Sequence, residues 1–240
     1  MNQEVQNQYA LNWTQESALL DEHNIYEQLA KSLPSGNVLE FGCGSGRGTA
    51  QMIKADHAVL SLDNNLALIE EASRFLNELG LEANIINSDF FTLSKENLDT
   101  INEFKPTILT GWFIGASPDV MVSRTPEQPL LLEKGKLYRE KIEDILVSSD
   151  VCLASVECIQ LVNRSYMSIS AKSKDIFQSQ KEDYDTHVFS CAGFEVVTVE
   201  IMDWPRDESE FAYGAAHNPN FIGGEAKPVI ISITAKRIAN

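Results

Sequence analysis

Val38-Leu39-Glu40-Phe41-Gly42-Cys43-Gly44-Ser45-Gly46 is the stretch of sequence that decides the fold of this chain. An apolar run typical of a buried strand leads directly into three glycines at alternate positions, and a helical pattern follows from residue 47. Glycine is needed where the backbone adopts a positive φ or where a ligand approaches without a Cβ in its way. The start of the following helix offers free N–H groups and a partial positive charge. The stretch therefore predicts a binding loop for a nucleoside with a polar or anionic tail.

The spacing of these glycines separates two kinds of nucleoside ligand. A dinucleotide fingerprint has the form G-x-G-x-x-G/A, and counted from Gly42 its third glycine would stand at position 47, where the chain has Arg47. A nicotinamide-dependent oxidoreductase is therefore the least favoured function. The spacing is instead acidic-x-G-x-G-x-G, with Glu40 two residues ahead of Gly42.

Two further landmarks follow the next two predicted strands. Asp63 closes the second strand, 19 residues after Gly44, and a carboxylate in that place can accept hydrogen bonds from both hydroxyls of a ribose. Asn87-Ser88-Asp89-Phe90 follows the third strand. With these motifs in this order, the chain resembles the class I S-adenosylmethionine-dependent methyltransferases over roughly residues 36–160, and beyond that only in its strand pattern.

The resemblance implies both a function and a cofactor site. The chain would be a methyltransferase whose cofactor is S-adenosyl-L-methionine. The glycines would let the methionine portion pass, with Glu40 near its ammonium group. Asp63 would hold the ribose, and Asp89 with Phe90 would frame the adenine. Cys43 is expected to fill space in the loop and not to act as a nucleophile. The expected cofactor-binding residues are Glu40, Gly42, Cys43, Gly44, Gly46, Asp63, Asn64, Asp89, Phe90 and Gly111.

Short apolar runs alternate with amphipathic stretches along the chain, a pattern typical of a parallel sheet covered by helices. The expected fold is a Rossmann-like, doubly wound α/β sheet of seven strands, mostly parallel with an antiparallel last strand, and with helices on both faces. Residues 1–35 are expected to form an N-terminal helical extension, and residues 36–240 the domain that binds the cofactor. The predicted strands are residues 37–41, 58–62, 83–86, 107–111, about 151–156, 194–202 and 229–235.

The composition of the chain limits its partners. Its 19 basic residues stand against 35 acidic ones, which gives a formal net charge of −16. Because nucleic-acid binding depends on Lys and Arg that neutralise phosphates, we expect a small-molecule or protein acceptor and no nucleic acid. No apolar run approaches the ~18–20 residues that span a bilayer, and the polar start lacks a signal-peptide pattern. A cytoplasmic protein without a membrane partner is expected. The four cysteines contain no CxxC pair, so no metal site is predicted.

Three long segments leave strands at the edge of the sheet where a ligand would bind, namely residues 112–136, 162–175 and 203–227. They are the expected walls of the acceptor site, and 112–136 and 203–227 are predicted to be insertions on the acceptor side. The candidate acceptor-binding residues are aromatic: Tyr9, Trp13, Trp112 and Phe113.

No catalytic residue is assigned from the sequence. Methyl transfer is an in-line displacement that depends on holding two atoms close and aligned, and a general base is needed only for an acceptor that arrives protonated. Tyr213 and His217 are the candidate bases. Two alternatives stay open. An aminopropyltransferase-like enzyme would need acidic residues after the fourth strand, where none stands before Asp119. The other alternative is a non-catalytic module that binds S-adenosylmethionine.

Overall fold

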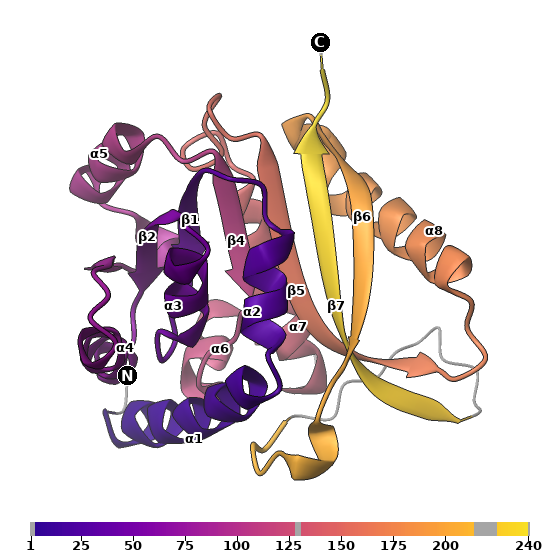
Figure 1. The fold of residues 1–240 in the computed structure, drawn as a ribbon, viewed down its shortest axis with the longest axis horizontal. Coiled ribbons are helices and arrows are strands. Elements are labelled where there is room, and N and C mark those ends of the chain that lie inside the picture. Colours follow the sequence, from indigo (N-terminus) through magenta and orange to yellow (C-terminus); the bar gives the residue numbers. More distant parts are fainter. Residues whose placement is uncertain (1–2, 128–130, 214–224, 240) are drawn as a thin grey trace.

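A computed structural model of the chain, which describes residues 3–127, 131–213 and 225–239, contains a seven-stranded sheet (Figure 1). The strand order is β3-β2-β1-β4-β5-β7-β6. β1 pairs parallel with β2 and β4, and parallel pairing continues to β3 on one side and to β5 on the other. The strands are β1 (Asn37–Phe41), β2 (Ala58–Asp63), β3 (Asn84–Asn87), β4 (Ile108–Trp112), β5 (Cys158–Ser168), β6 (Phe194–Asp203) and β7 (Ala226–Arg237).

β7 differs from the other strands because it runs antiparallel to both of its neighbours, β5 and β6. A mostly parallel sheet of seven strands, with the last strand of the chain antiparallel, is the fold predicted from the sequence. That prediction is confirmed. Trp112 at the end of β4 pairs with Val162, whereas the β5–β7 pair continues to Ser168 opposite Ala226. β5 and β7 therefore reach beyond the carboxyl end of β4.

Helices cover both faces of the sheet (Figure 1), because alternate residues of its strands supply two hydrophobic cores. Val38 of β1 belongs to the core that α1, α2 and α3 share, and the next residue, Leu39, belongs to the core that α7 closes. This alternation is the period-two pattern of a strand that is buried on both faces. The helices are α1 (Gln3–Glu22), α2 (Ile25–Ser32), α3 (Arg47–Lys54), α4 (Leu66–Glu78), α5 (Lys95–Phe104), α6 (Pro118–Arg124), α7 (Leu131–Leu146) and α8 (Ser173–Tyr184).

The boundary predicted for the fifth strand is wrong. β5 begins at Cys158, and the residues expected to form it, 151–156, lie in turns. Val151 and Val156 are fully buried, so their apolar character reflects packing in the core and not pairing in the sheet. Residues 162–175 are likewise no loop, because β5 continues along β7 to residue 168 and α8 begins five residues later.

The two N-terminal helices pack into the same core as the sheet. Trp13 and Leu20 of α1 and Leu29 of α2 are buried together with Val38 of β1. In Figure 1, α1 lies crosswise at the carboxyl end of β4, next to the loops that leave the parallel strands. Within the described residues, no helix combines the length and the apolar character that a membrane-spanning segment needs.

Candidate cofactor site

The glycine loop joins the carboxyl end of β1 to the first residue of α3. Gly42, Gly44 and Gly46 adopt φ angles of 84°, 53° and 83°, a region that glycine enters without the steric cost of a Cβ. The backbone N–H of Gly42 donates to the carbonyl of Leu62 at 2.8 Å, which ties the loop to β2. The strand, loop and helix predicted from the sequence are therefore present, and each glycine is required by its backbone conformation.

The three glycines nevertheless differ in what surrounds them. A Cβ at Gly42 would meet no atom within 4 Å, so this position is open to a ligand. A Cβ at Gly44 would lie 2.6 Å from the indole nitrogen of Trp13, and one at Gly46 would lie 2.9 Å from the Cα of Ala72. Gly46 therefore allows the loop to pack against α4, and Gly44 allows α1 to approach the loop.

Asp63 ends β2 and turns its carboxylate towards the glycine loop. Its Oδ2 accepts a hydrogen bond from the backbone N–H of Gly44 at 3.0 Å, and its Oδ1 accepts from that of Asn65 at 2.9 Å. Burial raises the pKa of Asp63, while these hydrogen bonds lower it. The side chain of Asn65, and not that of Asp63, caps α4 by accepting from the N–H groups of Ala67 and Leu68.

Glu40 is buried on the other side of the loop backbone. Its Oε2 accepts hydrogen bonds from the hydroxyls of Thr49 and Ser61, each at 2.6 Å. Burial raises the pKa of Glu40 to about 7, although both hydrogen bonds oppose the shift. Cys43 is also buried, with its Sγ 3.8 Å from Oδ2 of Asp63, and burial raises the pKa of its thiol well above the ordinary value. A thiol that stays protonated is a poor nucleophile, which supports the prediction that Cys43 fills space.

A cavity lies between the glycine loop, the end of β2, the segment after β4 and α1. Its empty volume is about 570 Å³, a figure that includes the opening to solvent. This main cavity contains most of the predicted site. The predicted residues that border it are Tyr9, Trp13, Gly42, Gly44, Asp63, Asn64, Phe90, Trp112 and Phe113.

A second, smaller cavity lies on the far side of Trp13. Glu40, Cys43 and Gly48 border it, and Trp13, Gly42, Gly44 and Trp112 border both cavities. The indole of Trp13 thus stands between the two spaces above the loop. The remaining residues around the second cavity are Tyr26, Ser45 and Arg47.

Three predicted cofactor residues, Gly46, Asp89 and Gly111, border neither cavity. Asp89 caps the short helix η1 (Phe90–Thr92) through the N–H of Phe91, and its other oxygen pairs with Arg124 of α6. Gly111 packs inward, because a Cβ there would lie 2.7 Å from the side chain of Ile114. Asp89 thus contacts Arg124, and Gly111 leaves room for the side chain of Ile114, three residues further along the chain. The roles predicted for Asp89 and Gly111 toward a cofactor stay predictions.

Of the two candidate bases, the structure describes Tyr213 alone. The hydroxyl of Tyr213 donates to Glu16 of α1 and accepts from Arg164 of β5, and its ring borders neither cavity. Burial raises the pKa of Tyr213, so its phenol keeps its proton at neutral pH. His217 lies outside the described residues.

Sequence reasoning missed four polar residues that border the main cavity, namely Gln6, Asn65, Ser117 and Tyr138. Gln6 of α1 donates from Nε2 to the hydroxyl of Ser117 at 2.6 Å and accepts from the side chain of Asn65 at 3.2 Å. Tyr138 of α7 approaches from the opposite side. Tyr138 is four residues from Ile142, a spacing that places both on the buried side of a helix. A polar tyrosine on an otherwise apolar helix face was the signal in the sequence that could have indicated a site residue.

Phe113, the residue after β4, has a strained backbone. Its φ is 54°, in the left-handed region that side chains other than glycine rarely adopt. The conformation is held by a hydrogen bond from its N–H to the carbonyl of Val162 at 2.8 Å, and by burial of its ring against Trp13 and Tyr26. Strain of this kind is often found at binding sites, and here it turns the chain at the edge of the main cavity.

Comparison with known proteins gives likenesses of structure only. No protein-family model matches the chain, and no curated protein sequence matches it. Magnesium protoporphyrin IX methyltransferase (ChlM) from Synechocystis PCC 6803, solved with bound SAH, is 11% identical, with a TM-score of 0.49 over 92% of this chain and 82% of that one.

Two other solved structures are similar to the same degree. TYW2 from M. jannaschii, in complex with AdoMet, is 10% identical, with a TM-score of 0.48 over 90% of this chain and 75% of that one. The [4+2]-cyclase SpnF is 9% identical, with a TM-score of 0.48 over 89% of this chain and 81% of that one. Because identities this low leave function open, we base the function on the residues of the site.

Proposed function

We propose that the chain binds S-adenosylmethionine across the glycine loop and is a methyltransferase that acts on a small molecule. One observation carries this proposal. The open face of Gly42 and the carboxylate of Asp63, which come from the ends of neighbouring parallel strands, border the same cavity. Ligands of open α/β sheets bind at the carboxyl ends of the strands.

The residues present fit the cofactor. Because Gly42 has no Cβ, space for a ligand remains beside its backbone. Asp63 borders the same cavity and would hold the ribose hydroxyls. Phe90 is nearly buried against Phe41, with ring centroids 5.1 Å apart, and its ring borders the cavity as an apolar neighbour for an adenine. Glu40 in the second cavity would face the ammonium group of the methionine end.

The chain's own groups would bind, orient and exclude water. When bound, the cofactor would supply a methyl group on an activated sulfonium. The rings of Tyr9, Trp13 and Phe113 form an apolar wall of the main cavity that keeps water away from the reacting atoms. Burial raises the pKa of Tyr9 to about 12, so its hydroxyl would donate a hydrogen bond at neutral pH and would not act as a base.

Two considerations limit the class of acceptor. The net charge of −16 opposes the binding of phosphate backbones, so we propose a small molecule and use RNA as a control ligand. Solved structures with a similar fold include proteins described as a putative tRNA (m1A22) methyltransferase and a putative RNA methyltransferase. An aminopropyltransferase is less well supported, because Asp119 does not border the cavity and accepts a hydrogen bond from Ser117.

Calorimetric titration with S-adenosylmethionine and S-adenosylhomocysteine tests the proposal. Asp63→Asn should weaken both ligands at least about tenfold, because a hydrogen bond to a charged acceptor is worth ~1.5–3 kcal/mol. Asp150→Asn, at an exposed turn residue, is the matched control and should leave affinity unchanged. No binding to the wild-type protein at millimolar ligand would refute the cofactor assignment.

Asp63 also accepts hydrogen bonds from Gly44 and Asn65, so Asp63→Asn could weaken binding by disturbing the loop. A second measurement therefore uses the wild-type protein alone. The wild-type protein should bind adenosine more tightly than 2′,3′-dideoxyadenosine. A screen for methyl transfer to phenols, carboxylates, amines and a short RNA then separates an enzyme from a non-catalytic binding module. Turnover with none of these acceptors, despite tight cofactor binding, would favour the binding module.

A further inference from the structure

Arg164 lies on the part of β5 that continues beyond the end of β4. Val162 is the last residue of β5 to pair with β4, and Arg164 follows it on the same face of the strand. The guanidinium carbon lies 5.2 Å from the ring centroid of Trp13, 5.5 Å from that of Phe113 and 4.4 Å from that of Tyr213. A half-buried cation thus lies outside both cavities, against two of the aromatic rings that border the main cavity, those of Trp13 and Phe113.

Arg164 has no carboxylate partner. No carboxylate oxygen of residues 3–127, 131–213 or 225–239 lies within 4.0 Å of its guanidinium. The residues outside these ranges, 1–2, 128–130, 214–224 and 240, include no aspartate or glutamate. By contrast, Arg47, Arg74, Arg124 and Arg139 each pair with a carboxylate. Arg164 therefore differs from these arginines in that none of the described carboxylates forms a direct ion pair with it.

A single hydrogen bond to the described part of the chain orients this guanidinium. Its Nη1 donates to the hydroxyl oxygen of Tyr213 at 2.7 Å, and that hydroxyl donates its own proton to the buried carboxylate of Glu16. Among the described side chains, the nitrogens that are buried without a partner do not include any of Arg164. With respect to the described residues, its remaining guanidinium nitrogens are therefore at least partly accessible and have no hydrogen-bond acceptor.

A second arginine adds to the positive charge at this place. The guanidinium carbon of Arg206 lies 5.2 Å from the centroid of the same Tyr213 ring. It donates to the carbonyl of Ser209, and no carboxylate oxygen of the described residues lies within 4.0 Å of it. The guanidinium groups of Arg164 and Arg206 thus both contact the ring of Tyr213. The buried carboxylate of Glu16, which accepts the hydrogen bond of the Tyr213 hydroxyl, supplies a negative charge near them.

We propose that Arg164 binds the carboxylate of the methyl acceptor, so that the acceptor is a small planar acid. The proposal rests on the proposed function and adds the class of its substrate. Trp13 contacts both Gly44 of the glycine loop and Arg164, so about one aromatic ring separates the anion site from the loop. The free N–H groups of a guanidinium match a carboxylate in pairs, and the flat walls of Trp13 and Phe113 suit an aromatic body.

Calorimetry in saturating S-adenosylhomocysteine tests this assignment with defined probes. 4-Hydroxybenzoate and indole-3-acetate should bind at least about tenfold more tightly than the corresponding amides, 4-hydroxybenzamide and indole-3-acetamide. Arg164→Gln should abolish the difference, and Arg164→Lys should restore part of it. Arg74→Gln, at an exposed arginine on α4, is the matched control. The affinity for S-adenosylhomocysteine should stay unchanged in all three variants.

Several results would overturn the proposal. They are equal binding of acids and amides by the wild-type protein, absence of binding by either acid at millimolar concentration, or binding of acids that survives Arg164→Gln. Tighter binding of a short RNA that depends on Arg164 would also overturn it, in favour of a nucleic-acid acceptor. If S-adenosylhomocysteine fails to bind while the acids still bind through Arg164, the proposed function fails and the anion site stands. The comparison of acid with amide uses the wild-type protein, so it does not depend on the folding of any variant.

Discussion

At the scale of single residues, Glu40 links cofactor binding to pH. In the protein without ligand, burial raises the pKa of this carboxyl to about 7, so it is partly protonated at neutral pH. The ammonium group that we place beside it binds best to the ionised carboxylate. Below pH 7, binding must therefore displace a proton from Glu40, and above pH 7 it need not.

The affinity for S-adenosylhomocysteine should accordingly rise between about pH 6 and about pH 8, by on the order of tenfold. Calorimetric titration across this range measures the effect. Glu40→Gln, which keeps an acceptor for the Thr49 and Ser61 hydroxyls but cannot ionise, should bind more weakly and with little dependence on pH. A flat pH profile for the wild-type protein would place the ammonium group away from Glu40.

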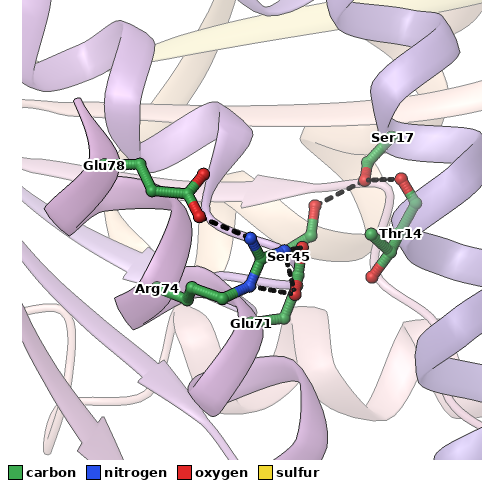
Figure 2. A network of polar contacts seen from close by, with 6 residues as sticks. All are labelled: Thr14, Ser17, Ser45, Glu71, Arg74 and Glu78. Carbon is green, nitrogen blue, oxygen red and sulfur yellow. Dashed lines mark hydrogen bonds and ion pairs between the residues drawn. The ribbon is translucent and has the colours of Figure 1, made fainter.

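At the scale of secondary-structure elements, α1 is the cover of the site. The hydroxyls of Ser17 on α1 and Ser45 in the glycine loop lie 2.5 Å apart (Figure 2). One turn further along α1, Asp21 accepts from Arg47 at 3.3 Å and from Gln51 at 2.9 Å. Together with Trp13 on Gly44, these contacts hold α1 across the loop that a cofactor must reach.

Loosening α1 should therefore change the speed of cofactor exchange more than the affinity. With Ser17→Ala combined with Asp21→Ala, S-adenosylhomocysteine should associate and dissociate several-fold faster, because the cover opens more often. Stopped-flow tryptophan fluorescence follows both rates, since Trp13 lies beside the loop. Equal rates in the wild-type and double-variant proteins would mean that the ligand enters without movement of α1.

Arg74→Ala is a suitable control for this experiment. Arg74 lies on α4, and Figure 2 shows it between Glu71 and Glu78, with which it forms ion pairs at 2.7 and 2.6 Å. All three side chains are on the surface of one helix, where solvent screens their attraction. The substitution should leave both exchange rates and the melting temperature almost unchanged.

At the scale of the whole molecule, the net charge of −16 should make stability depend on salt. Repulsion among excess carboxylates destabilises a folded chain, and added salt screens it. The melting temperature should therefore rise by a few degrees between about 10 and about 200 mM sodium chloride. Differential scanning calorimetry measures this shift. A constant or falling melting temperature would indicate that local ion pairs such as Arg124–Asp89 outweigh the global repulsion.

The sequence predicted those parts of the molecule that depend on local patterns. The glycine loop and the parallel strands follow from spacing within short segments, and the structure contains them. Tyr9, Trp13, Trp112 and Phe113 border the main cavity, and their role in acceptor binding stays a prediction. Sequence patterns did not indicate that Asp89 pairs with Arg124, 35 residues further along the chain, or that Ile114 packs beside Gly111. The roles predicted for Asp89 and Gly111 toward a cofactor stay predictions. The beginning of β5 was missed because Val151 and Val156, the β-branched ends of an apolar turn, are as fully buried as residues of a strand.

The position of β7 also governs the order in which the chain can fold during synthesis. β7 pairs between β5 and β6, yet the ribosome makes it after both of them. The five parallel strands from β3 to β5 can assemble as soon as β5 has emerged. β6, in contrast, has no strand to join until β7 arrives, so it must wait as an unpaired hydrogen-bonding edge. The glycine loop can thus form before β6 and β7 have been made, whereas the sheet is complete only after β7 has emerged.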